Sequence, residues 1–253
     1  MLRALLERGA VPVTEERLDE AFDVLDQAME EVGARFREQY APAIDRVFRD
    51  ALADTRADLA EWLVRMTESP EWVPVATELA FGLPEDDTPR DPASTSEPVA
   101  LTDEGLVLRG AIDLVEARGD ELRATDHKSG AVPDFDGPIT DGGRSLQPVL
   151  YARALEALRP DAKVVGGRLY YCTSRGQFAA RPVVLTHTAR DAVRTVAETL
   201  GKSIDKGFLP AWPDAGACDR CDYRRVCGPA EPRRVRKKHK NMVGPFLKLR
   251  KLP

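Results

Sequence analysis

Two short stretches, Gly110-Ala111-Ile112-Asp113 and Asp126-His127-Lys128-Ser129-Gly130, decide the expected fold and site of this chain. Both lie in apolar, β-branched segments, and Gly119-Asp120 between them is typical of a hairpin turn. Side chains alternate along a strand, so Asp126 and Lys128 share one face while His127 points to the other. Pairing of the two strands is therefore expected to bring the Asp113 carboxylate close to Asp126.

Two carboxylates and one ammonium group at a single point are suited to phosphodiester hydrolysis. Mg²⁺ prefers oxygen ligands, and a neighbouring lysine can hold a water molecule or offset the charge of a phosphate. An Asp-x-Lys tripeptide taken alone is more often a solvated ion pair on a strand. Here the apolar flanks favour a metal site, because a buried carboxylate needs a partner or a cation.

The order of these motifs, followed by Gln147 and Tyr151, resembles the PD-(D/E)XK nuclease superfamily. The closest resemblance is to the RecB-like branch, which includes AddB-type helicase–nuclease subunits, and it extends from about Trp72 to Cys227. It implies that Gln147 and Tyr151 belong to the helix that completes the catalytic set. These two residues are four apart, so a helix places them on one face.

The resemblance also assigns roles to the charged residues. It implies that Asp113 and Asp126 bind Mg²⁺ or Mn²⁺ and that Lys128 is the catalytic lysine. Glu78 lies in the strand-like segment 75–81 and matches the acidic residue of the family's preceding strand. It is therefore a third candidate metal ligand.

The order of elements read from hydrophobic periodicity predicts an α/β fold with a mixed central sheet flanked by helices. The family resemblance implies that this fold is restriction-endonuclease-like. Strands are expected at 73–82, 99–102, 105–117, 121–128, 168–173 and 177–185, and later helices at 144–158 and 188–206. The N-terminal region is expected to be helical. Its apolar stripes, from Leu18 to Phe36 and from Ile44 to Met66, are expected to face a core.

The chain is expected to divide into four segments. These are a helical region at 1–70, a nuclease core at 71–210, a cysteine-bearing segment at 211–229 and a basic tail at 230–253. The net charge of −5 hides an asymmetry, because the residues from Gly228 onward carry nine Lys or Arg and only one acid. Such a tail either contacts phosphates electrostatically or is simply solvated, and both readings stay open.

The composition of the chain predicts a cytoplasmic protein without a membrane partner. No apolar run is long enough to form a transmembrane helix, and the N-terminus lacks the pattern of a secretory signal. The sequence also has no Gly-rich phosphate loop and no Walker-type lysine. A helicase motor that works with this chain is therefore expected on another polypeptide or another segment.

Three cysteines, Cys218, Cys221 and Cys227, lie within ten residues of a Pro- and Gly-rich stretch. In the cytoplasm, clustered thiols favour a metal over a disulfide, and thiolates suit zinc or an iron–sulfur cluster. Three ligands close neither a tetrahedral zinc site nor a 4Fe–4S cluster. The fourth cysteine, Cys172, follows two tyrosines in a strand and is expected to be a buried structural thiol.

The family resemblance implies that the fourth cluster cysteine lies far upstream, followed by a histidine and a leucine-rich helix. Met1–Arg8 resembles that helix, but neither the cysteine nor the histidine precedes it here. The chain is therefore expected to be a truncated copy, the product of a misplaced start codon, or the tail of a larger helicase–nuclease. The cysteines are expected to hold the tail against the helical region and to frame a channel for single-stranded DNA.

Together these features predict a metal-dependent DNA nuclease, and more specifically an exonuclease acting with a helicase in DNA repair and recombination. The alternative is a catalytically inactive nuclease-like module that binds DNA or supports a helicase–nuclease complex. A third reading is a zinc-stapled interaction protein.

Overall fold

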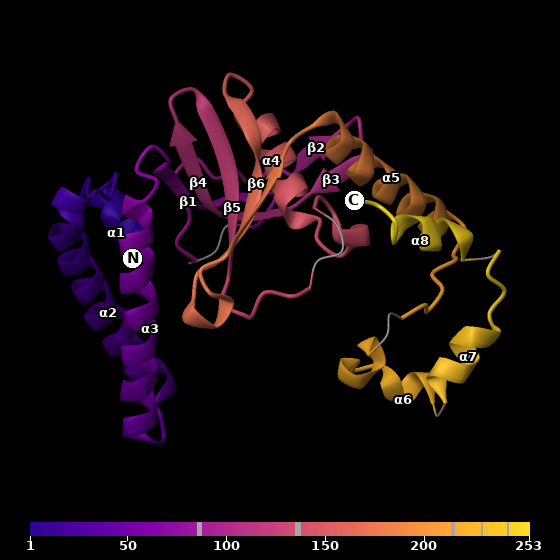
Figure 1. The fold of residues 1–253 in the computed structure, drawn as a ribbon, viewed down its shortest axis with the longest axis horizontal. Coiled ribbons are helices and arrows are strands. Elements are labelled where there is room, and N and C mark those ends of the chain that lie inside the picture. The colour runs from indigo at the N-terminus through magenta and orange to yellow at the C-terminus, as the bar shows by residue number, and fades with distance from the viewer. Residues whose placement is uncertain (85–87, 135–137, 214–215, 229, 242) are drawn as a thin grey trace.

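The computed structural model describes residues 1–84, 88–134, 138–213, 216–228, 230–241 and 243–253. Parts of the segment between the expected strands 73–82 and 99–102, of the cysteine segment and of the basic tail thus lie outside the described residues. A five-stranded mixed sheet lies at the centre, flanked by helices (Figure 1). The predicted α/β class is confirmed.

The central sheet has the strand order β1-β4-β5-β6-β7. Its strands are β1 (Val73–Phe81), β4 (Gly110–Arg118), β5 (Glu121–Lys128), β6 (Lys163–Tyr171) and β7 (Ala180–Val184). β4 and β5 form the expected hairpin around Gly119-Asp120. β5 and β6 pair in parallel, and that pairing needs the crossover that α4 (Gln147–Leu158) provides. β2 (Val99–Leu101) and β3 (Leu106–Leu108) form a separate two-stranded sheet.

The remaining helices lie at the two ends of the molecule (Figure 1). They are α1 (Leu2–Glu7), α2 (Leu18–Tyr40), α3 (Asp45–Thr67), α5 (His187–Asp205), α6 (Arg224–Cys227), α7 (Glu231–Lys237) and α8 (Gly244–Leu249). Helices α1–α3 stand on one side of the sheet, and α6 and α7 lie beyond the other side. The structure therefore does not bring the cysteine segment against the N-terminal helices, contrary to the expectation from sequence.

The main core lies between α4 and the sheet. Its fully buried side chains include Leu79, Ile112, Ala152 and Leu155. The opposite face of the sheet is covered in part by α3, whose Trp62 contacts rings on β5 and β6. The sheet thus has two covered faces, one against α4 and one against α3.

The N-terminal helices have their own core, but it is shorter than the apolar stripes predict. Leu5, Leu25 and Leu63 are fully buried where α1, α2 and α3 meet. At the outer end of the α2–α3 pair, side chains that were expected to be buried are 46–63% exposed; they are Val32, Phe36, Ile44 and Val47. The reason is that the pair extends past the sheet, so two helices alone cannot enclose both stripes (Figure 1).

Strand boundaries differ from the prediction where glycine is involved. β6 begins at Lys163 and not at residue 168, because Gly166 and Gly167 lie inside the strand. An added Cβ at Gly166 would lie 2.1 Å from a β7 carbonyl oxygen, and one at Gly167 would lie 2.1 Å from the Pro148 carbonyl oxygen of α4. These glycines allow β7 and α4 to approach β6 closely.

Gly167→Ala is expected to destabilise the fold by about 1–3 kcal/mol or more, because its methyl group overlaps the α4 backbone. Gly201→Ala is the matched control: it lies within α5, where an added Cβ meets no atom within 4 Å. That change should stabilise by about 0.5–1 kcal/mol through helix propensity. Urea unfolding of both variants measures the difference, and equal free energies of unfolding would contradict the close packing of β6.

Candidate active site

The site lies where β4 and β5 part from one another. Their backbone pairing runs from the turn to Leu114 opposite Thr125, the last pair of that ladder. Beyond it, β4 continues beside β1, while β5 continues beside β6. The backbone N–H of His127 donates to Asp113 Oδ2 at 2.7 Å, so a carboxylate takes the place of the next ladder bond. The parting strands leave Asp113 and Asp126 facing one space.

Asp126, Lys128 and Gln147 form a closed hydrogen-bonded group. Lys128 Nζ lies 2.6 Å from Asp126 Oδ2 and donates to Gln147 Oε1 at 2.8 Å. Gln147 Nε2 donates to Asp126 Oδ1 at 2.9 Å. Asp126 is buried at 4% exposure, so a neighbouring cation and donor are required to stabilise its charge.

Tyr151 and Glu78 complete the predicted set. Tyr151 lies one turn after Gln147 in α4, and its hydroxyl makes a hydrogen bond with the Gln147 side chain. Burial raises the pKa of Tyr151, so its hydroxyl stays protonated. Glu78 follows Thr77 and precedes Leu79 on β1, and these two pair with the residues on either side of Asp113. The structure thus gathers all six residues that the sequence singled out for catalysis and magnesium.

The backbone at Glu78 is unusual, because its φ angle is +55°. Residues with a side chain rarely adopt this left-handed conformation, and it costs of order 1–3 kcal/mol. The strain accompanies an exposed carboxylate that lies near the other acids. No sequence signal marks this conformation, since it arises from the path of β1 past β4.

The acids of the site repel one another. Burial raises the pKa of Asp113, and the charge of Asp126 raises it further, against the lowering by the His127 N–H and Lys128. Burial and the charge of Asp113 also raise the pKa of Glu78, while Arg3 of α1 lowers it. Arg3 is a neighbour that motif reasoning missed, since nothing in its sequence context indicates a contact with β1.

A cavity of about 270 Å³ opens beside Lys128 and Gln147. Arg144, Ser145 and Tyr171 also line it. The sequence analysis did not single out these residues. The position of Tyr171 follows from register alone, because it pairs with Lys128 across the parallel β5–β6 strands.

The His127 ring lies on the α3 side of the sheet, as strand alternation predicts, and its Nδ1 is 3.9 Å from Asp113 Oδ2. Its ring contacts Trp62 and Tyr170 on the α3 side of the sheet. Burial, and after it the charge of nearby Arg168, lowers the pKa of His127 to about 4. The ring is therefore neutral at physiological pH.

The oxygen donors of the site suit magnesium or manganese. Asp126 Oδ2 is buried and makes no hydrogen bond among the described residues, although Lys128 is paired with it as an ion. The described residues contain no group of three or more His, Cys, Asp or Glu placed to hold a metal ion. Mg²⁺ is commonly bound by one or two carboxylates, with water and substrate phosphate filling the shell. Asp113 and Asp126 fit that smaller requirement.

The cysteines lie apart from this site. Cys218 lies in a short 3-10 turn. Burial raises the pKa of its thiol, and the charges of the nearby Cys221 and Cys227 thiols raise it further. All three thiols are free, and within the described part of the chain they do not form a metal-binding group. Cys172 is half-buried and its thiol lies 3.7 Å from the Lys128 carbonyl oxygen, in keeping with a structural role.

A five-stranded mixed sheet flanked by helices, with acids and a lysine where two strands part, defines a restriction-endonuclease-like nuclease fold. The chain matches the family model of the PD-(D/E)XK nuclease superfamily over residues 1–228, and it belongs to that superfamily. No curated protein matches it. Within the described residues, no helix is both long and apolar enough to cross a membrane.

Asp113→Asn is expected to stabilise the metal-free protein at neutral pH. With a raised pKa, the folded state binds more protons than the unfolded state, so the free energy of unfolding falls as pH rises through that interval. The amide still accepts the His127 N–H but carries no charge. Urea unfolding in chelator from pH 4 to 7.5 should therefore show a stability gain that grows with pH.

The matched control is Asp54→Asn, which changes an exposed carboxylate on α3. It removes a carboxylate outside the acidic site, so the gain specific to D113N is measured against it. A D113N variant that is no more stable at pH 7 than at pH 4, relative to wild type, would contradict the repulsion described above.

Proposed function

We propose that this chain is a divalent-metal-dependent deoxyribonuclease. Membership of the PD-(D/E)XK superfamily supports a nuclease in general. The observation that carries the proposal is the convergence of Asp113, Asp126 and Lys128 where β4 and β5 part, with Gln147 joining the last two. Carboxylates and a lysine in contact at a strand end are the groups that phosphodiester hydrolysis requires.

Each residue has a role that follows from its contacts. Asp113 and Asp126 hold Mg²⁺ or Mn²⁺, with Glu78 within electrostatic reach as a further ligand. Bound there, the cation supplies Lewis-acid stabilisation of the phosphate and lowers the pKa of a bound water. Lys128 positions the attacking water and offsets phosphate charge. Gln147 and Tyr151 hold the lysine in place, because Gln147 bonds both Lys128 and Tyr151.

The finer assignment is to an exonuclease of the RecB/AddB-like branch that acts with a helicase in DNA repair. The basic tail supports a DNA substrate. Helix α7 and the residues after it carry exposed cations that can contact phosphates; these are Arg233, Arg234, Arg236, Lys237 and Lys240. The iron–sulfur or zinc site at Cys218, Cys221 and Cys227 stays a prediction. Visible absorbance and metal analysis of the purified protein test it.

A second candidate is a nuclease-like module that binds DNA without cutting it. The observation that favours it is the occupation of Asp126 by Lys128 and Gln147, together with the lack of a three-ligand group in the described residues. A module of this kind binds DNA equally well with and without divalent metal. An active enzyme needs the metal for cleavage.

Lys128→Met is expected to lower Mg²⁺-dependent degradation of single-stranded DNA at least 10²-fold, because it removes the charge nearest the reacting phosphate. Lys163→Met is the matched control, since Lys163 lies at the far end of the same sheet and pairs with Glu121. The measurement is release of labelled nucleotides, with urea unfolding to show that both variants fold. Equal rates of nucleotide release by wild type and K128M would show that the nuclease assignment is wrong.

Mg²⁺ or Mn²⁺ is expected to raise the melting temperature of the wild type, because a ligand that binds only the folded state stabilises it. At tenfold excess over the dissociation constant the gain is about 1.4 kcal/mol. Asp113→Asn should abolish the metal-dependent shift, and Asp54→Asn should retain it. An equal shift in wild type and D113N would place the metal elsewhere and favour the non-catalytic module.

A further inference from the structure

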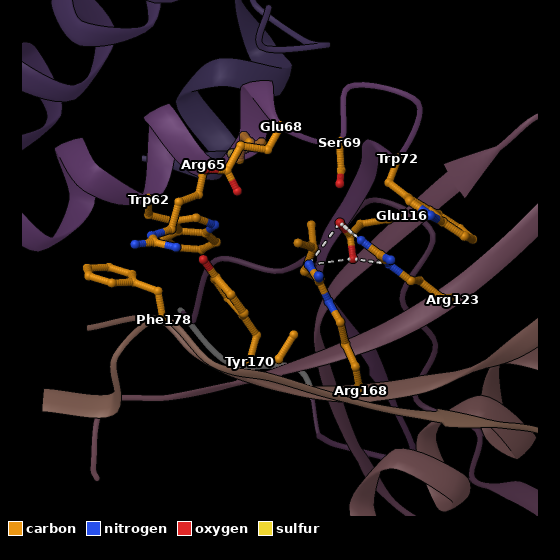
Figure 2. Close-up of a pocket in the computed structure, with 13 residues that line it drawn as sticks. Trp62, Arg65, Glu68, Ser69, Trp72, Glu116, Arg123, Arg168, Tyr170 and Phe178 are labelled. Atoms are coloured by element: carbon orange, nitrogen blue, oxygen red, sulfur yellow. Dashed lines mark hydrogen bonds and ion pairs between the residues drawn. The ribbon is translucent and has the colours of Figure 1, made fainter. Parts of the chain in front are cut away.

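A second cavity, of about 180 Å³, lies between α3 and the face of the sheet that is turned away from Asp126 and Lys128 (Figure 2). It is on that face because Arg123 and Arg168 alternate with residues that face α4. We call it the arginine–aromatic cavity, because three arginines and four aromatic side chains line it. They are Arg65, Arg123, Arg168, Trp62, Trp72, Tyr170 and Phe178.

One wall of the arginine–aromatic cavity carries more positive than negative charge. Glu116 is buried and accepts hydrogen bonds from Arg123 at 2.8 Å and from Arg168 at 3.0 Å. Arg168 Nε donates to Thr125 Oγ1. One carboxylate therefore serves two guanidinium groups. These hydrogen bonds use Nε and Nη2 of each arginine, so Nη1 of Arg123 and Nη1 of Arg168 lie outside them.

The opposite wall carries a third guanidinium group. Arg65 stacks over the Phe178 ring at 4.7 Å, and its Nη2 pairs with Glu61 at 2.8 Å. Its Nε is buried and has no hydrogen-bond partner among the described residues. A buried donor without an acceptor is costly, and it indicates a site where an acceptor binds. Glu68, on the same helix, is exposed at the rim.

The remaining lining offers flat rings and hydroxyl donors. Trp72 is stacked by Arg118 and Arg123, at 4.5 and 4.2 Å. Trp62 and Tyr170 lie across the cavity from it, with their ring centroids 5.7 Å apart and with Arg168 4.9 Å over the Tyr170 ring (Figure 2). Burial raises the pKa of Tyr170 to about 12, so its hydroxyl stays a donor. Figure 2 shows the Ser69 hydroxyl directed toward the same space.

We propose that the arginine–aromatic cavity binds the phosphate group of a nucleotide, with the base against the aromatic wall. Guanidinium groups with free N–H donors match phosphate oxygens, and rings beside them stack on a base. The volume is below the ~300–1,000 Å³ of drug-sized sites, so it admits one phosphate and part of one nucleotide. The ligand is either a free nucleotide or the phosphorylated end of a nucleic acid.

The test uses the full-length Lys128→Ala variant in chelator, so neither hydrolysis nor a metal at the acidic site contributes. Two of the three tryptophans of the chain line the cavity, and intrinsic fluorescence therefore reports occupancy. The probes are inorganic phosphate, AMP, and a short oligonucleotide with either a 5′-phosphate or a 5′-hydroxyl. Saturable binding of AMP alone identifies a free nucleotide. A preference for the 5′-phosphorylated oligonucleotide over the 5′-hydroxyl form identifies a nucleic-acid end.

Arg65→Gln, added to the same background, should weaken binding about tenfold or more, because it removes a charged donor. Arg56→Gln is the matched control: it lies on the same helix but pairs with Asp26 on α2. Circular dichroism and urea unfolding establish that both variants fold. No saturable change with any probe, or equal affinity in R65Q and R56Q, would overturn the proposal. Neither result depends on nuclease activity, so the proposed function is tested separately.

Discussion

The hydrogen bond from the His127 N–H to the Asp113 carboxylate is the interaction on which the site depends. It lies just past the last backbone pair of β4 and β5, where β4 turns to β1 and β5 to β6. A continued backbone ladder would hold the strands about 4.8 Å apart and leave no space between them. The Asp113 side chain accepts this hydrogen bond instead, and Asp113 lies close enough to Asp126 for their charges to interact.

The central strands carry acidic side chains on one face of the sheet and arginine side chains on the other. On the α4 face, Asp113 and Asp126 bring negative charge together with Lys128. On the α3 face, Glu116 is shared by Arg123 and Arg168, so positive charge is in excess. Strand alternation makes this separation possible, because adjacent residues of β5 point to opposite sides. One sheet therefore carries two sites that favour ligands of opposite charge.

The placement of Asp113, Asp126 and Lys128, and of Gln147 beside Tyr151, was predictable from the sequence because its geometry is local. Alternation in β5, the two-residue turn, and the four-residue spacing of Gln147 and Tyr151 fix these side chains with no long-range information. The left-handed backbone of Glu78 and the close contacts of Gly167 depend on how distant elements pack, so no local pattern marks them. The arginine–aromatic cavity was missed for the same reason, since α3, β4, β5 and β6 each contribute only a few of its residues.

The charge balance around Asp113 explains why the site favours a cation. The neighbouring ionisable groups are three carboxylates, Glu78, Asp113 and Asp126, against Lys128 and Arg3. Burial is the main cause of the raised pKa values of Glu78 and Asp113, and repulsion from a neighbouring carboxylate adds to it in both. His127 adds no charge, because burial keeps its ring neutral and turns it toward Trp62. A protonated histidine here would compete with a metal for the same carboxylates. The donor to Asp113 is the uncharged backbone N–H of His127, so this hydrogen bond leaves the negative charge of the carboxylate in place.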